Sequence, residues 1–186
     1  MAKVVVLGAG TGGMPAAYEV KEALGKDHDV LMVNEREEFR FVPSNPWVAV
    51  GWRESSAVTM PIEKYLSKKN IGFKCARIDK IDAEANLLIS SEGEEISYDY
   101  LIIATGPRLA FDAIEGAGPD GFTQSVCTLD HAQHCYSDFE KLVANPGPAI
   151  VGAFQGASGD RGLGLEGLWK VVLGQVGEKS KIFEFF

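Results

Sequence analysis

Residues 3–14 read KVVVLGAGTGGM and decide the fold. The β-branched run Lys3–Leu7 predicts a strand, and the glycine-rich turn behind it leads into Met14–Leu24. Apolar residues in Met14–Leu24 recur at the three- and four-residue spacing of one helix face. The apolar stretch Asp29–Asn34 predicts a second strand. A strand, a glycine-rich turn, a helix and a strand within about thirty residues predict the opening unit of a nucleotide-binding α/β fold.

The turn GAGTGG matches the pattern G-x-G-x-x-G, and it stands between a predicted strand and a predicted helix. Gly8 permits a tight turn, Gly10 lets a pyrophosphate approach the backbone, and Gly13 lets the helix pack on the strand. Free N–H groups and the positive end of the helix dipole favour a diphosphate there without a lysine. The alternative is a flexible glycine-rich turn without a ligand.

The second predicted strand ends in a carboxylate. Glu35 lies 27 positions after Gly8, at the strand tip, where it can bond a ribose hydroxyl, and Asn34 is the alternative donor for that role. If the turn binds no ligand, Glu35 is a solvated surface residue. The predicted cofactor contacts in this unit are Gly8, Gly10, Thr11, Gly12, Gly13, Asn34 and Glu35.

Residues 98–106 read YDYLIIATG. They resemble the aromatic, acidic, apolar, Ala-Thr-Gly segment of flavoproteins with two dinucleotide domains, which implies FAD as the cofactor. An uninterrupted apolar strand over Tyr100–Ala104 is expected to be buried on both faces of a parallel sheet. The small residues behind it leave room for a cofactor. The alternative is a core strand followed by a plain turn. The predicted contacts here are Ala104, Thr105, Gly106 and Pro107.

Shorter patterns predict the remaining elements. Thr59–Lys69 is expected to be a helix capped by Thr59, and Asp130–Val143 a helix ended by the NPGP segment at 145–148. Short strands are predicted at Phe73–Ile81, Asn86–Ser90, Glu95–Tyr98 and Ala149–Ala153. Together they predict an α/β, Rossmann-like FAD/NAD(P)-binding three-layer fold with a parallel central sheet and a small antiparallel β-meander. We expect an FAD-binding domain over 1–110, a connection and the start of a second dinucleotide-type domain over 111–158, and a divergent tail over 159–186.

Composition narrows the function classes. The 186 residues are 46% hydrophobic and 24% charged, with a formal net charge of −8, which is typical of a globular protein. The acidic balance disfavours nucleic acid as a partner. No apolar run reaches the roughly 18 residues of a spanning helix, and no secretion signal is evident. We therefore expect a cytoplasmic protein, or one bound peripherally at the inner membrane surface.

The three cysteines are odd in number and never spaced as Cys-x-x-Cys, which indicates neither a disulfide framework nor a zinc ribbon. Cys127, His131, His134 and Cys135 are nevertheless metal-ligand types close together in the sequence. Helical spacing places Cys135 on the apolar face of its predicted helix. We therefore expect a core cysteine and two surface or capping histidines, with no metal site.

Four further stretches resemble one family when their order and spacing are taken together. They are FVPSNPW at 41–47, GPRLAF at 106–111, SVCTLDHA at 125–132 and GAFQGAS at 152–158. They look like the sulfide:quinone oxidoreductases, and the likeness extends from Ala2 to Ser158. The related flavocytochrome c sulfide dehydrogenases and type II NADH dehydrogenases share the general motifs and fit these stretches less well.

The resemblance implies a flavoenzyme that oxidises hydrogen sulfide through redox cysteines beside FAD and passes two electrons to a membrane quinone. By this resemblance Cys127 is the catalytic candidate, and the further cofactor contacts are Ser44, Asn45, Pro46 and Ile78. Gly159 stands where the family has another redox cysteine. The family's C-terminal half, with a further cysteine, the quinone pocket and the membrane-binding helices, has no counterpart here.

The first hypothesis is therefore a shortened sulfide:quinone-type flavoprotein that keeps the flavin site. We do not expect turnover by this chain alone, because a disulfide that accepts hydrosulfide needs a pair of cysteines. The alternatives are a non-catalytic nucleotide-binding or interaction module, which uses the glycine turn for NAD or for no ligand, and another flavin-dependent NAD(P)H dehydrogenase. A homo-oligomer through the apolar part of the tail also stays open.

Overall fold

The computed structural model describes residues 1–148, so the predicted strand Ala149–Ala153 and the tail 159–186 lie outside the described residues. The chain divides into two compact units. Met1–Asn45 and Arg53–Arg108 form the first, which contains the glycine-rich loop. Pro46–Trp52 belongs to the second unit, together with Leu109 and the residues after it.

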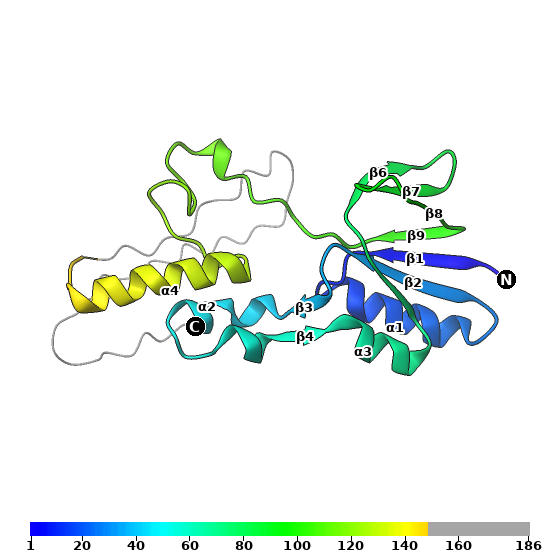
Figure 1. Ribbon diagram of the computed structural model, residues 1–186, viewed down its shortest axis with the longest axis horizontal. Coiled ribbons are helices and arrows are strands. Elements are labelled where there is room, and N and C mark those ends of the chain that lie inside the picture. The colour runs from blue at the N-terminus through cyan, green and yellow to red at the C-terminus, as the bar shows by residue number, and fades with distance from the viewer. Residues whose placement is uncertain (149–186) are drawn as a thin grey trace, which may run out of the picture. The chain divides into compact units, whose positions relative to one another are not determined.

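A parallel sheet forms the centre of the first unit (Figure 1). Its four strands are β1 (Lys3–Leu7), β2 (Asp29–Asn34), β5 (Gly72–Cys75) and β9 (Tyr100–Ile103), in the order β5-β2-β1-β9. Leu7 pairs with Val33 on one side and with Ile103 on the other. All three strand pairings are parallel, so the predicted parallel central sheet is confirmed.

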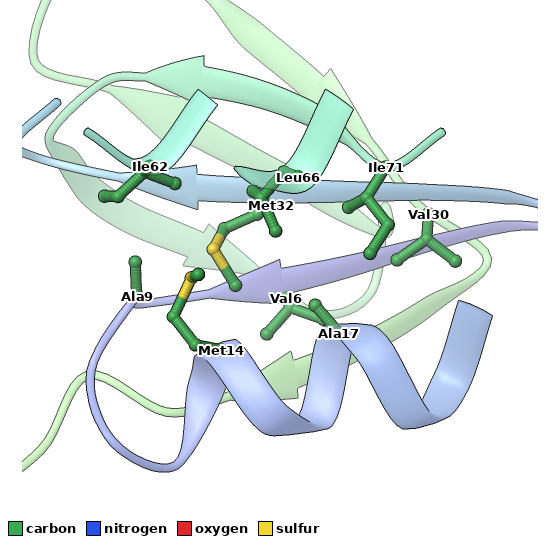
Figure 2. Close-up of a cluster of buried hydrophobic side chains, with 9 residues drawn as sticks. All are labelled: Val6, Ala9, Met14, Ala17, Val30, Met32, Ile62, Leu66 and Ile71. Carbon is green, nitrogen blue, oxygen red and sulfur yellow. The ribbon is translucent and has the colours of Figure 1, made fainter. Parts of the chain in front are cut away.

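Two different layers cover the two faces of this sheet, because alternate residues of a strand point to opposite sides. Helices α1 (Gly13–Leu24) and α3 (Ile62–Leu66), the latter extended by η3 (Ser67–Lys69), pack on the face that carries Val6. Figure 2 shows Met14 and Ala17 of α1 on the same side as Val6 and Met32. This cluster consists of Val6, Ala9, Met14, Ala17, Val30, Met32, Ile62, Leu66 and Ile71.

The other face packs against an antiparallel meander of β6 (Ile78–Asp82), β7 (Leu87–Ser90) and β8 (Glu95–Ser97). Leu88 and Ile96 of the meander join Val5, Leu7 and Val33 of the parallel sheet in a second buried cluster. The first unit thus has three layers: helices, parallel sheet and meander. The predicted three-layer fold with an antiparallel meander is confirmed.

The prediction of one helix from Thr59 to Lys69 is wrong at its beginning. Thr59–Pro61 is strand β4, which pairs antiparallel with β3 (Glu38–Arg40), and the helix starts at Ile62. Pro61 has an extended backbone (φ −67°, ψ 126°). A proline also disfavours helical geometry in the residue before it, so Met60 stays in the strand. The 3-10 turns η1 (Val42–Ser44) and η2 (Ser55–Val58) flank this two-stranded ribbon.

Two further strand predictions needed correction. The stretch Phe73–Ile81 is two strands in two different sheets, separated at Ala76 and Arg77. The expected burial of Tyr100–Ala104 on both faces is also wrong, because β9 is the edge strand of the sheet as described over 1–148 and Tyr100 is 65% exposed. An apolar sequence predicts a strand but does not fix its place in the sheet.

The second unit is built around helix α4 (Leu129–Ala144), which confirms the helix predicted at Asp130–Val143. Thr128 caps it, since its hydroxyl accepts a hydrogen bond from the His131 N–H at 3.1 Å. The chain turns at Gly51, just after α2 (Asn45–Ala49), and this glycine abuts the Tyr136 ring of α4. The short turn η4 (Phe111–Ala113) places Phe111 against His131, with 5.6 Å between ring centroids. None of the helices described over 1–148 is long and apolar enough to span a membrane.

Candidate nucleotide-binding site

Two glycines of the loop between β1 and α1 are fixed by close backbone contacts. Gly8 has a φ of +100°, and a Cβ added there would lie 2.5 Å from the Ala104 carbonyl oxygen. A Cβ on Gly13 would overlap the Gly8 carbonyl group. Only glycine fits at either position, as expected for the tight turn and for the packing of the helix on the strand.

The other two glycines face open space. Among residues 1–148, a Cβ on Gly10 or Gly12 would meet no heavy atom within 4 Å. The first hydrogen bond of α1 runs from the Met14 N–H to the Gly10 carbonyl at 3.0 Å. The N–H groups of Thr11, Gly12 and Gly13 come before it, and no acidic side chain lies in the first turn. This end of α1 therefore fits a diphosphate, which takes free amides and the positive end of a helix dipole.

Glu35 stands at the tip of β2, on the rim of an open groove of about 730 Å³. Its Oε1 lies 3.0 Å from Nη1 of Arg36, and both side chains are about half exposed. A solvent-accessible carboxylate at this strand end can accept hydrogen bonds from ribose hydroxyls. The groove is lined by Glu35, Arg36, Glu37, Glu38, Arg40, Thr59, Met60, Pro61 and Cys75.

Of these nine groove residues only Glu35 was predicted as a cofactor contact, and Arg36 and Cys75 are among the eight that were missed. Arg36 follows the predicted ribose contact directly, and that adjacency is the one signal that could have identified it. Cys75 reaches the groove through strand register, because it pairs with Asn34 in β2. Partial burial and the nearby Glu37 carboxylate raise the pKa of the Cys75 thiol. Nothing in the sequence around residue 75 indicates this position.

Both polar atoms of the Asn34 side-chain amide form hydrogen bonds with backbone groups. Its Oδ1 accepts a hydrogen bond from the Ala9 N–H at 2.9 Å, and its Nδ2 donates one to the Arg36 carbonyl at 2.8 Å. The side chain therefore connects the glycine loop to the turn after β2. Both hydrogen bonds hold the chain, and the role of Asn34 as the alternative ribose contact stays a prediction.

The Ala-Thr-Gly segment lies directly behind the loop. The Ala104 N–H donates to the Leu7 carbonyl at 2.8 Å, and the Ala104 carbonyl is the group that a side chain on Gly8 would strike. Gly106 has a φ of +76° with open space beside its Cα. Ala104 and the Thr105 backbone therefore support the loop, and Thr105, Gly106 and Pro107 follow the C-terminal end of β9.

The four contacts implied by the resemblance differ in burial and in their position in the fold. Ser44 is fully buried, and its hydroxyl accepts a hydrogen bond from Nη1 of Arg53 at 2.9 Å. Asn45 is 1% exposed, and within residues 1–148 neither its Oδ1 nor its Nδ2 has a hydrogen-bond partner. A buried amide without a partner is costly, so this side chain suits a polar ligand group. Ile78 packs against the core on the meander side, and Pro46 belongs to the second unit.

A family model for pyridine nucleotide-disulphide oxidoreductases matches residues 2–153. The chain belongs to this family. It is 39% identical over 159 residues to the sulfide-quinone reductase of Aquifex aeolicus. The aligned residues cover 85% of this chain and 36% of that protein. It is 33% identical over 122 residues to the mitochondrial sulfide:quinone oxidoreductase of Mus musculus, covering 64% of this chain and 26% of that one.

Solved structures give the same result. The sulfide:quinone oxidoreductase of Aquifex aeolicus superposes with a TM-score of 0.73 at 37% identity, over 78% of this chain and 33% of that chain. NDH2 of Plasmodium falciparum in complex with NADH gives a TM-score of 0.63 at 25% identity, over 77% and 30%. The chain thus spans about a third of the length of these relatives. The resemblance to sulfide:quinone oxidoreductases is confirmed.

The cysteines of this family member are all free thiols. Cys127 is exposed in the second unit, just before the Thr128 cap of α4, and its N–H donates to the Ser125 hydroxyl at 3.1 Å. Its catalytic role stays a prediction. Partial burial and the Asp138 carboxylate raise the pKa of the Cys135 thiol. Over 1–148, no group of three or more His, Cys, Asp or Glu side chains is placed to hold a metal ion.

Proposed function

We propose that this chain carries the FAD-binding part of a sulfide:quinone-reductase-like flavoprotein. The observation that supports this most is the start of α1. The N–H groups of Thr11, Gly12 and Gly13 precede the first hydrogen bond of the helix, and the space beside Gly10 and Gly12 is open among the described residues. A diphosphate fits that geometry. The groove on whose rim Glu35 stands suits the adenosine half of the same ligand.

The residues present fit FAD in three further respects. The small Ala104–Gly106 corner leaves open space beside Gly106. The buried Asn45 amide has unused donor and acceptor capacity among the described residues. The half-exposed Glu35 carboxylate can hold a ribose hydroxyl. When bound, the flavin supplies two-electron transfer, and the protein contributes binding, orientation and electrostatics.

Sulfide and quinone are proposed as substrates of the whole flavoprotein, because the Aquifex and mouse relatives are a sulfide-quinone reductase and a sulfide:quinone oxidoreductase. Cys127 is proposed as the thiol that reacts with sulfur species in that setting. One cysteine cannot form the internal disulfide that hydrosulfide would open, and Gly159 stands where the family has another cysteine. We therefore propose that this chain binds FAD but does not turn over sulfide alone. Quinones reside in membranes, so a peripheral membrane position accompanies this proposal.

The test is flavin retention. The purified chain is mixed with excess FAD, desalted, and examined by visible absorption spectroscopy. We expect bound flavin with the spectrum of its oxidised form, and we expect anaerobic sulfide to leave it oxidised. A colourless protein after desalting would contradict FAD binding. Bleaching by sulfide would instead contradict the claim that this chain lacks the cysteine pair for turnover, and bleaching by NADH would favour an NADH dehydrogenase.

A further inference from the structure

The glycine loop and the turn after β2 are joined by one side chain. The Asn34 amide accepts a hydrogen bond from the Ala9 N–H at 2.9 Å and donates one to the Arg36 carbonyl at 2.8 Å. Its backbone carbonyl also accepts a hydrogen bond from the Ala76 N–H at 2.8 Å, at the end of β5. Asn34 therefore ties three chain segments together at the C-terminal edge of the sheet.

The two segments that its amide joins carry the two halves of the nucleotide site. Ala9 lies between Gly8 and Gly10 in the loop that faces the diphosphate. Arg36 pairs with Glu35, the proposed ribose contact, at 3.0 Å. An amide is suited to this place, because it is a donor and an acceptor at once, whereas a carboxylate could not donate to the Arg36 carbonyl.

We propose that Asn34 is a positioning residue that sets the spacing between the diphosphate cradle and the ribose carboxylate, without itself touching the nucleotide. This inference rests on the proposed function of the same site. A ligand that occupies both halves depends on their spacing. A ligand that occupies one half adapts to that half alone. Loss of the Asn34 amide should therefore weaken the binding of ADP more than the binding of inorganic pyrophosphate or of adenosine.

The experiment is isothermal titration calorimetry of the full chain with ADP, pyrophosphate and adenosine. We expect Asn34→Ala to raise the dissociation constant of ADP about tenfold, because binding must then fix the spacing of the two halves that the Asn34 amide fixes in the free chain. The constants for pyrophosphate and for adenosine should each change less than about threefold, because each half keeps its own contacts. The test is therefore the ratio of the dissociation constant of ADP to that of pyrophosphate, which should rise in Asn34→Ala.

Asn86→Ala is the matched control. Asn86 is an exposed residue of the same unit in the left-handed region (φ 54°), so its replacement destabilises the fold without touching the site. It should leave all three constants unchanged. If Asn34→Ala does not fold by circular dichroism, N34D replaces it, because the carboxylate keeps the acceptor and removes the donor. Its added charge repels ADP and pyrophosphate alike, so their ratio still rises if the proposal holds.

The outcomes separate the two claims. A wild-type chain that binds no ADP overturns the proposed function and this inference with it. If the wild-type chain binds ADP but the Asn34 variants raise the dissociation constants of ADP and of pyrophosphate by the same factor, the inference alone is overturned. That result would show that Asn34 stabilises the loop without setting the spacing of the two halves.

Discussion

The substitution Gly10→Ala separates ligand binding from folding most cleanly. The added methyl group meets no atom of the described part of the chain within 4 Å, and the backbone at Gly10 lies outside the left-handed region. Alanine also reduces the freedom of the unfolded chain, so we expect the stability to stay the same or rise by about 0.5 kcal/mol. The methyl group would instead stand where a diphosphate approaches the backbone.

The expected loss of affinity follows from the contacts that the methyl group blocks. Losing two charge-assisted hydrogen bonds at about 1.5 kcal/mol each costs about 3 kcal/mol. This corresponds to a dissociation constant for ADP or FAD about a hundredfold higher. Calorimetry gives the affinity, and thermal unfolding by circular dichroism gives the stability.

Gly147→Ala is the control for Gly10→Ala. Gly147 also has no described heavy atom within 4 Å of an added Cβ and no left-handed φ, and it lies in the second unit. It should leave both affinity and stability unchanged. Unchanged ADP affinity in Gly10→Ala would refute the reasoning, because the space before Gly10 would then not be where the phosphates bind.

Three further outcomes follow from the contacts described above. Gly8→Ala should lower the free energy of unfolding by about 2 kcal/mol, measured by urea denaturation, because a φ of +100° and the nearby Ala104 carbonyl both oppose a side chain. Cys75 should react with iodoacetamide more slowly than a free thiol at pH 8, because its raised pKa leaves less thiolate, and Glu37→Gln should speed the reaction. Peptide mass mapping measures that rate, and equal rates with and without Glu37 would contradict it. Thr128→Ala should cost about 1 kcal/mol of helix stability, seen as an earlier loss of helical circular dichroism in urea, and an unchanged midpoint would exclude the cap.

Local patterns were enough to predict the nucleotide half of the fold. The run Lys3–Leu7, the glycines after it and the periodic Met14–Leu24 each carry their pattern within a short stretch of sequence, so spacing was enough to predict a strand, a turn and a helix. The helix at Leu129–Ala144 was predicted for the same reason. Gly8 and Gly13, the two glycines of this loop with close backbone contacts, were also identified from the motif.

Long-range pairing could not be predicted in this way. Thr59–Pro61 becomes a strand because Glu38–Arg40 lies beside it, and nothing near Thr59 in the sequence reveals that partner. Cys75 reaches the groove through its register with Asn34. The contacts of the Asn34 amide with the loop and with the Arg36 carbonyl likewise have no signal in the sequence. Each of these features depends on where one strand lies against another.

The central claim is that the free amides at the start of α1 bind a diphosphate. Nuclear magnetic resonance tests it directly, by following the backbone amide signals of the ¹⁵N-labelled chain as ADP is added. We expect the signals of Thr11, Gly12 and Gly13 to shift together and to saturate with the dissociation constant measured by calorimetry. Signals that stay in place at saturating ADP, or shifts confined to residues far from this loop, would contradict the account.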